Sequence, residues 1–228
     1  MKIVNSNSLS ETLDALTELF FYGRQWSKFQ KEKVAKWIAG RQGIRGSYAN
    51  MFGPTGRDFN KGIKLFTGEV VRSRAAIGHI LGEEACRSLI LLDVPDKCVK
   101  DAVRRAELGM MRVLGPRKVR GYNVGMYCCG TCTVAFWRNL LVGGLGNAKQ
   151  RLAAGMKALK HYRDGHGKWH RFPFYYTLLA LNEIELPSAI SEMRYAAKVC
   201  EEYLKRAPKH HKLDQRRKIL IERVLAKC

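Results

Sequence analysis

The sequence predicts an all-α protein built from repeated helical hairpins. Apolar residues recur every three or four positions along most of the 228 residues, which is the spacing of helices with one buried side. Clusters of glycine and proline separate these segments. No segment alternates strictly between apolar and polar residues, as a half-buried strand would. Short loops between successive helices favour antiparallel neighbours, so we expect one all-α domain over residues 1–228.

The first 60 residues are predicted to contain two helices and a long loop. Apolar residues recur at helical spacing from residue 13 to residue 20, and Ser10 is the expected N-cap of this helix. A second helix is predicted over residues 28–40, with Phe29 on its buried side. The interval 43–62 is rich in glycine and contains a proline, which predicts a loop.

Residues 61–206 are predicted to form helical pairs, and a basic helix over 207–228 closes the chain. Prolines and glycine-rich loops mark the breaks between these helices, because both residue types interrupt helical geometry. The predicted helices cover residues 73–92, 97–114, 126–141, 148–161, a run that begins after Pro173, 188–206 and 213–227.

The composition indicates a folded core and a strongly positive surface. Apolar residues make up 46% of the chain and aromatic residues 10%, which argues against global disorder. Lys and Arg number 41 against 20 Asp and Glu, for a net charge of +21. Such a charge attracts phosphates, nucleic acid or acidic partners. No helix-turn-helix, zinc-finger or RNA-recognition signature accompanies it, so a solvated basic surface is an equally good interpretation.

The cysteines and the apolar pattern predict a cytoplasmic protein without a membrane span. The chain has seven cysteines, an odd number, and its first residues lack the apolar core of a secretory leader. Its longest apolar runs are too short to span a membrane. We therefore expect reduced thiols rather than a framework of disulfides.

A repeated frame marks the ends of several predicted helices. Leu159, Arg163 and Gly167 are spaced by four residues, and Trp169 follows two positions later. The frame describes a helix whose last turn carries a long polar side chain and is followed by a glycine turn and an aromatic ring. The polar side chain could accept hydrogen bonds from the free N–H groups at the beginning of the next helix. Two further copies are Gly109, Val113, Arg117 and Gly121, and Ile38, Gln42, Gly46 and Tyr48.

These copies resemble the Gln–Trp repeat of squalene and triterpene cyclases. The match is carried by Trp37-Ile38-x3-Gln42-x3-Gly46-x-Tyr48 and by Leu159-x3-Arg163-x3-Gly167-x-Trp169. The β subunits of protein prenyltransferases share this fold, an α/α toroid. Residues 130–137 resemble the segment that carries their zinc-binding Asp-x-Cys, and residues 174–177 resemble the segment that carries their zinc-binding His. The resemblance implies a partial toroid.

The chain departs from that family at the residues that bind metal and substrate. Cys132 falls on the cysteine ligand, but Gly130 and Tyr176 occupy the aspartate and histidine positions. The chain also lacks the Asp-x-Asp-Asp and Asp-Asp-x-x-Asp runs of terpene enzymes. About nine helices fit in this length, whereas a complete toroid needs about twelve.

A zinc site is one possible use of the cysteines. Cys128 or Cys129 can share a helix face with Cys132, because positions three and four apart are neighbours on a helix. His79 and Glu83 form a second pair at a similar depth in another helix, so stacked repeats could bring the two pairs together. We expect Cys132 to be the best ligand, with Cys128 and His79 as its partners. The alternatives are a redox-active thiol pair and cysteines that only fill apolar space.

The predicted ligand is an isoprenoid diphosphate or a similar anionic amphiphile, and the sequence does not decide whether the protein is an enzyme. An aromatic cavity would hold the apolar part, and basic side chains at loop ends would hold the phosphate. The alternatives are a non-catalytic basic module that binds nucleic acid or an acidic protein, and a scaffold without a ligand. A partial toroid would expose an apolar edge, which predicts a homo-oligomer. The expected ligand-binding residues are Tyr127, Tyr175, Tyr176, Arg117, Lys118 and Arg163.

Overall fold

The protein is all-α, as predicted. The computed structural model describes residues 4–119, 124–143, 145–206 and 211–228, and within them the side chains of all residues except 116–119. These ranges contain ten α-helices and one small hairpin of two strands, and none of the helices has both the length and the apolar character needed to cross a membrane.

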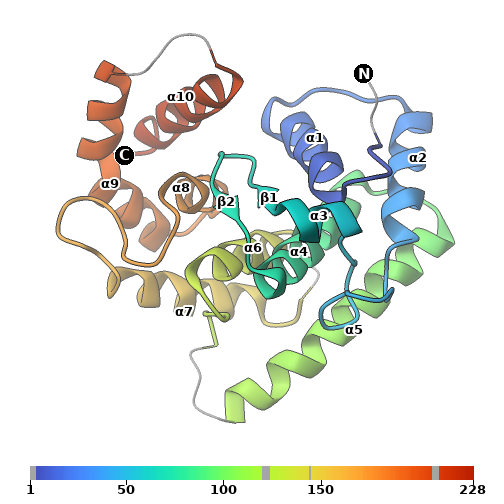
Figure 1. The fold of residues 1–228 in the computed structure, drawn as a ribbon. Coiled ribbons are helices and arrows are strands. Elements are labelled where there is room, and N and C mark those ends of the chain that lie inside the picture. The colour runs from blue at the N-terminus through green and yellow to red at the C-terminus, as the bar shows by residue number, and fades with distance from the viewer. Residues whose placement is uncertain (1–3, 120–123, 144, 207–210) are drawn as a thin grey trace.

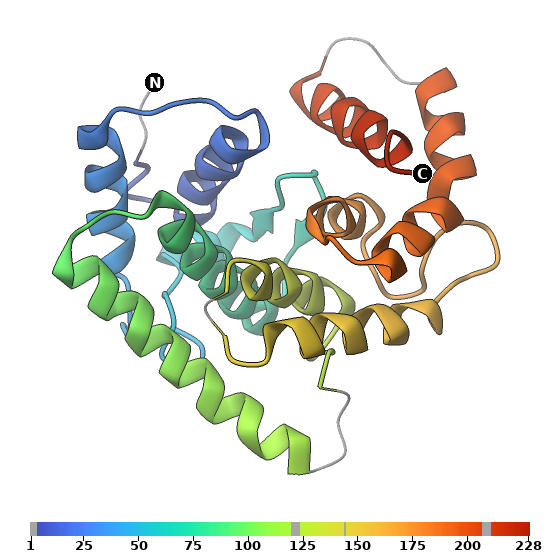
Figure 2. The same ribbon diagram turned by 180° about the vertical axis from the view of Figure 1, so that it is seen from behind.

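The helices form two rows that follow the order of the chain (Figure 1). In the inner row each helix packs on the next, and each helix of the outer row packs on at least one of its chain neighbours in the inner row. Most inner helices therefore form a hairpin with the outer helix that follows them, and the outer row curves around the outside of the inner row (Figure 2). The inner row comprises α1 (Leu9–Phe21), α4 (Arg74–Leu92), α6 (Gly130–Leu141), α8 (Phe174–Glu183) and α10 (Lys212–Leu225). The outer row comprises α2 (Lys28–Ala39), α5 (Lys97–Val119), α7 (Ala148–Lys160) and α9 (Pro187–Arg206).

The two ends of the inner row meet through side chains of α10 and α1. Arg216 of α10 contacts Asp14 at 2.8 Å and Glu18 at 2.6 Å. Arg223 donates a hydrogen bond to the carbonyl oxygen of Phe21 at 2.8 Å. A cavity of about 490 Å³ is lined by residues from all five inner helices. The inner row therefore surrounds a common interior.

The segment between α2 and α4 departs most from expectation. The predicted loop over residues 43–62 contains a short helix, α3 (Gly56–Lys61), and an antiparallel hairpin follows it, formed by β1 (Ile63–Lys64) and β2 (Val70–Val71). Thr55 begins α3 with a capping box, in which its hydroxyl accepts from the backbone N–H of Asp58. Each strand has only two residues, so no alternating pattern could reveal it.

Three local predictions are wrong. The N-cap of α1 is Ser8 instead of Ser10, and its hydroxyl accepts from the Glu11 N–H at 3.1 Å and donates to Asp58 at 2.7 Å. Phe29 is 73% exposed, because it lies in the first turn of α2, outside the buried residues of that helix. Helix α6 begins at Gly130, four residues after the predicted start at residue 126, so Cys128 precedes the helix.

Candidate metal centre

The neighbouring helices α4 and α6 bring together the three residues expected to bind metal. Ser73 caps α4 through a side-chain hydrogen bond, and His79 lies in the second turn of that helix. Cys128 lies just before α6, and Cys132 lies in its first turn. Since α4 and α6 pack side by side, the beginning of one helix faces the beginning of the other.

The donor atoms of this group are close enough to share one metal ion. The ligand atoms of His79, Cys128 and Cys132 all lie within 4.8 Å of one another. His79 Nδ1 is 3.2 Å from Cys128 Sγ. Around a tetrahedral Zn²⁺ with ordinary Zn–N and Zn–S bonds, neighbouring ligand atoms are about 3.5–3.8 Å apart. The arrangement is thus geometrically able to hold a metal ion.

Cys129 adds a third sulfur beside this group. It is the N-cap residue of α6 and is exposed to solvent. The pKa of the Cys129 thiol falls to about 2, because the thiols of Cys128 and Cys132 and the backbone N–H groups of Cys132 and Thr131 stabilise its thiolate. The pKa of Cys132 rises well above its usual range, because its thiol is hydrogen-bonded to Cys128 and Cys129 and is buried. The beginning of α6 therefore favours a thiolate on Cys129 and a neutral thiol on Cys132.

Aromatic rings enclose the histidine. The ring centroid of Tyr48 is 3.7 Å from that of His79, and the centroid of Tyr127 is 5.2 Å from it. Tyr127 OH donates a hydrogen bond to Tyr48 OH. The backbone N–H of Tyr127 donates to Thr133 Oγ1 at 2.9 Å, which fixes the segment before α6 against that helix. Only 8% of the His79 surface is exposed, so the imidazole is held in one place by its neighbours.

The structure also explains why the ligand set implied by the family resemblance is not assembled. A Cβ atom at Gly130 would lie 2.1 Å from the carbonyl oxygen of Arg171, so no side chain fits at the family's aspartate position. Tyr176, at the family's histidine position, donates its hydroxyl to Glu84 in the protein interior. His79 and Cys128 supply donors beside Cys132 instead.

Glu83 does not join the metal group, although it lies four residues after His79. Its carboxylate accepts a hydrogen bond from Asn139 Nδ2 at 2.6 Å and is 1% exposed. Burial raises the pKa of Glu83 to about 8. Of the expected pair of His79 and Glu83, only His79 lies beside the cysteines.

The three tyrosines expected to line one cavity lie in different surroundings. Tyr127 is part of the metal centre described above. Tyr176 is 1% exposed and lies over Arg138, within a buried ion network. Tyr175 packs edge-on against Tyr203 and carries the guanidinium of Arg217 over its ring at 4.2 Å.

The buried ion network occupies the interior of the inner row. Arg138 is 1% exposed and contacts Glu84 and Glu183, and Arg87 contacts the same Glu183 at 3.0 Å. Because both carboxylates and both guanidiniums are paired, the charges compensate one another inside the protein. Two nitrogens of Arg87, Nε and Nη1, are buried without a hydrogen-bond partner.

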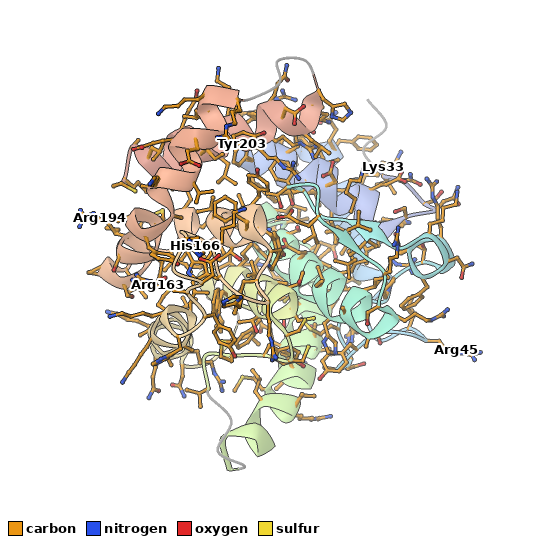
Figure 3. The ribbon with its side chains drawn as sticks, turned by 60° about the vertical axis from the view of Figure 1, so that its left-hand side comes forward. Lys33, Arg45, Arg163, His166, Arg194 and Tyr203 are labelled. Atoms are coloured by element: carbon orange, nitrogen blue, oxygen red, sulfur yellow. The ribbon has the colours of Figure 1, made fainter. Side chains whose placement is uncertain are left out.

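Of the three basic residues expected to bind phosphate, the structure describes only the side chain of Arg163. The guanidinium of Arg163 forms a two-point pair with Glu192, with N–O distances of 3.0 and 2.8 Å, and lies over the ring of Tyr195. Trp169 Nε1 donates to the same carboxylate at 2.9 Å. Figure 3 shows Arg163 beside the loop that carries His166. The side chains of Arg117 and Lys118 lie outside the described residues.

Three residues of the centre and its surroundings do not stand out as site residues in the sequence. The sequence indicates only that Cys129 is a neighbour of Cys132 on a helix. An N-cap position would have been a sufficient signal, because the beginning of a helix lowers the pKa of a thiol. Tyr48 stands out only as a member of the repeat frame, and Asn139 carries no local pattern that would link it to Glu83.

The donor set suits a soft or borderline metal. Two cysteine sulfurs and one imidazole nitrogen are ligands of zinc and related ions, whereas calcium and magnesium select oxygen. No oxygen ligand belongs to the group, since its members are His79, Cys128 and Cys132. No family model, curated protein or solved structure matches this chain.

Proposed function

We propose that this protein is a zinc protein in which His79, Cys128 and Cys132 hold the ion. The observation that carries the proposal is the convergence of three donor atoms within 4.8 Å, although His79 lies about fifty residues before the cysteines in the sequence. A histidine that only filled core space would not need two sulfurs beside its ring nitrogen. Zinc binding would deprotonate both thiols and so remove the cost of burying Cys132 as a neutral donor.

A zinc ion held by these three residues would keep a fourth coordination position for water or a substrate. Sites with three protein ligands are the catalytic type, whereas structural zinc sites are closed by four. Cys128 and Cys129 are exposed, so the ion lies within reach of solvent. The hydroxyl groups of Tyr48 and Tyr127 lie beside His79 and could orient a bound molecule. The chemistry proposed for the site is activation of a water or a thiol at the ion.

Metal analysis of protein purified without a histidine tag tests this proposal. We expect one equivalent of Zn²⁺ in the wild type, and a large loss of zinc in Cys128→Ser and in His79→Ala. The Co²⁺ form should show the spectrum of tetrahedral thiolate coordination. Cys98→Ser is the matched control, since Cys98 is exposed and lies outside the metal group. Equal zinc content in Cys128→Ser and the wild type would reject the proposed ligands.

A second candidate function is the binding of an anionic amphiphile in the interior of the inner row. The cavity of about 490 Å³ has an apolar wall formed by leucines and phenylalanines of α1, α4 and α8. Among its lining residues, five are cationic and one is acidic. The cationic residues are Arg24, Lys31, Arg87, Arg138 and Arg223, and the acidic residue is Glu183.

Arg87 and Arg138 pair with Glu84 and Glu183, and Arg24 pairs with Glu18, so the excess of positive charge comes mainly from Lys31 and Arg223. This excess and the apolar wall are what an isoprenoid diphosphate or a fatty acyl phosphate would need. The cavity is distinct from the metal centre. Arg87 lies eight residues after His79 on α4, so the two are separated by about 12 Å along the helix. Binding in the cavity is therefore a separate proposal from the zinc site.

Native mass spectrometry of the purified protein tests the second candidate. We expect a co-purified lipid-like anion, or a shift on addition of farnesyl diphosphate, in the wild type. Arg24→Gln combined with Lys31→Gln, at the rim of this cavity, should weaken that binding. Lys61→Gln combined with Lys64→Gln, which removes the same charge from a different hollow, should not. Equal binding by both double variants would exclude this cavity.

A further inference from the structure

Cys129 and Cys132 form a C-x-x-C pair at the beginning of α6. The sequence between them is Gly130-Thr131. Cys129 is the exposed N-cap residue, and Cys132 is fully buried in the first turn. The pair therefore consists of one thiol that a reactant can reach and a second thiol that only its neighbours can reach.

The local geometry keeps the two sulfurs together. Cys129 at the N-cap and Cys132 in the first turn are three residues apart and so lie on one face of the helix. Gly130 lies so close to the backbone of Arg171 that a side chain there would collide, and this contact holds the start of α6 in place. A thiol at a helix N-terminus is also favoured as a nucleophile by the helix dipole.

Cys128 is a poor alternative partner for Cys129. Adjacent Cα atoms across a trans peptide are about 3.8 Å apart, whereas disulfides usually join Cα atoms about 4.4–6.8 Å apart. Cα atoms three residues apart in an α-helix are about 5 Å apart, which is within that range. The geometry thus selects Cys132 as the partner of Cys129.

We propose that Cys129 and Cys132 are a redox-active dithiol that reduces a disulfide substrate, and that a metal ion bound at Cys132 blocks this reaction. The first part stands independently of the zinc proposal, and the blocking depends on it. Because Cys132 is shared, the centre can be a metal site or a disulfide at any one time. The same few residues would then exchange a metal-bound state for an oxidised, metal-free state.

The reaction is an ordinary thiol–disulfide exchange. The Cys129 thiolate attacks one sulfur of the substrate disulfide, the substrate S–S bond breaks, and the first substrate thiolate leaves. Cys132 then gives its proton to the released substrate thiolate and attacks Cys129 Sγ. This forms the Cys129–Cys132 disulfide and releases the second substrate thiolate. Two electrons pass from the protein dithiol to the substrate, which leaves as two thiols once protonated.

The test uses metal-free full-length protein incubated with mixtures of oxidised and reduced glutathione. All proteins carry Cys98→Ser and Cys228→Ser, which removes exposed thiols outside the centre. Alkylation followed by mass spectrometry counts the remaining thiols, and fragmentation locates the disulfide. In this background we expect the parent protein to lose two thiols together, with the bond between Cys129 and Cys132. His79→Ala and Cys128→Ser should behave the same way.

Two further variants distinguish the roles of the pair. Cys132→Ser should stop at a lasting glutathione adduct on Cys129, because the second thiol is missing. Cys129→Ser should form neither the adduct nor the internal disulfide. A parent protein that keeps both thiols in oxidised glutathione, or a disulfide that disappears in Cys128→Ser, would overturn the proposal.

Zinc separates this proposal from the metal assignment. Preloading with Zn²⁺ should prevent the loss of thiols in the parent protein but not in His79→Ala. If the metal-free protein oxidises as expected and zinc gives no protection, the dithiol stands and the shared metal site fails. If zinc binds and no disulfide forms, the metal site stands and the dithiol fails.

Discussion

At the scale of single residues, the least expected feature is the buried pair of Glu83 and Asn139. Asn139 Nδ2 donates to one carboxylate oxygen of Glu83, while Glu83 Oε1 and Asn139 Oδ1 are buried without a hydrogen-bond partner among the described residues. Burial raises the pKa of Glu83 to about 8. A protonated Glu83 supplies the donor that this pair of oxygens lacks, so the folded protein holds a proton here that the unfolded chain releases.

The sign of the resulting pH dependence follows from the raised pKa. Between the ordinary glutamate pKa of 4.5 and about 8, the folded state binds one proton more than the unfolded state. The free energy of unfolding therefore falls as pH rises, by up to about 1.4 kcal/mol per pH unit from this group. Glu83→Gln keeps a donor and an acceptor but cannot titrate. We expect its stability relative to the wild type to increase steadily across this range and to level off above it.

Urea unfolding of both proteins in a metal-free buffer series measures this difference. Glu83→Leu is the comparison variant, because it also removes the titration but leaves the amide of Asn139 without a partner. It should show the same pH dependence relative to the wild type as Glu83→Gln, while being about 1–3 kcal/mol less stable. Parallel stability curves for the wild type and Glu83→Gln would show that Glu83 keeps its charge in the folded protein.

At the scale of elements, the attachment of α10 to α1 is carried mainly by Arg216. This residue is 4% exposed, pairs with Asp14 and Glu18, and lies over the ring of Phe66 at 4.1 Å. Burial alone would raise the pKa of Glu18, but hydrogen bonds from Lys212 and Arg216 outweigh it and hold the pKa below the ordinary value. The pairing of Glu18 therefore contributes its full stabilisation at pH values above the pKa that Glu18 has in the unfolded chain. This contribution is lost as the pH falls through the lower pKa that Glu18 has in the folded protein.

Replacing Arg216 by Met should loosen the last helix. The substitution keeps much of the side-chain volume but leaves two carboxylates without their main partner, which costs about 3–5 kcal/mol. Thermal unfolding measures the loss, and hydrogen exchange should show faster exchange in α10 than elsewhere. Lys218→Met on the same helix is the control, because Lys218 makes only an exposed pair with Glu222. Its effect should stay within about 0.5 kcal/mol, and equal effects of the two variants would disprove the special role of Arg216.

Much of the element pattern is predictable because its signals are local. The start of α4 follows from a capping serine and the break after it from Pro95, and both act within a few residues. The predicted start of α6 is four residues early, because Met126 and Tyr127 continue the apolar pattern although they are not helical. Periodicity reports which residues are buried and does not report which of them are helical.

The candidate centre is partly predictable for a different reason. His79 and the cysteines lie at similar depths after their loops, so stacked hairpins bring them together, and the structure does so. The contact between α10 and α1 could not be foreseen, since Arg216 and Asp14 are 202 residues apart. The same holds for Asn139 and Glu83, which meet only because α4 and α6 pack side by side.

At the scale of the whole molecule, the positive charge is less available than the sequence indicates. The basic cluster over residues 205–227 suggests a charged face on the last helix. Arg216 is turned inward, Arg217 donates to the Thr67 carbonyl, and Arg223 donates to the Phe21 carbonyl. These arginines hold the fold together, so only part of the cluster can meet an anionic partner.

The remaining cations are spread over the surface. Figure 3 shows Arg194 and Arg45 projecting from opposite edges of the molecule, with Lys33 on the same side as Arg45. Exposed cations near the α9–α10 end include Lys205, Arg206 and Lys218. A dispersed positive field favours weak, sequence-independent attraction of nucleic acid over one specific interface. This is the form in which we propose the nucleic-acid alternative.

Binding to random duplex and single-stranded oligonucleotides across a salt series tests this property of the whole surface. We expect weak affinity that falls steeply between about 50 and 200 mM salt, because counterions are released from the nucleic acid. The slope of the logarithm of the binding constant against the logarithm of the salt concentration should become shallower when Lys205, Arg206 and Lys218 are exchanged for Gln. The expected change is about 0.9 for each phosphate that is no longer neutralised.

The control is a second triple variant with the same charge change, in which Gln replaces Lys33, Arg45 and Arg112. It distinguishes binding at the α9–α10 end from an effect of net charge. If the two triple variants lose affinity equally, the binding follows net charge and has no preferred end. Affinity that does not change with salt would rule out phosphate binding and leave the charge to an acidic protein partner.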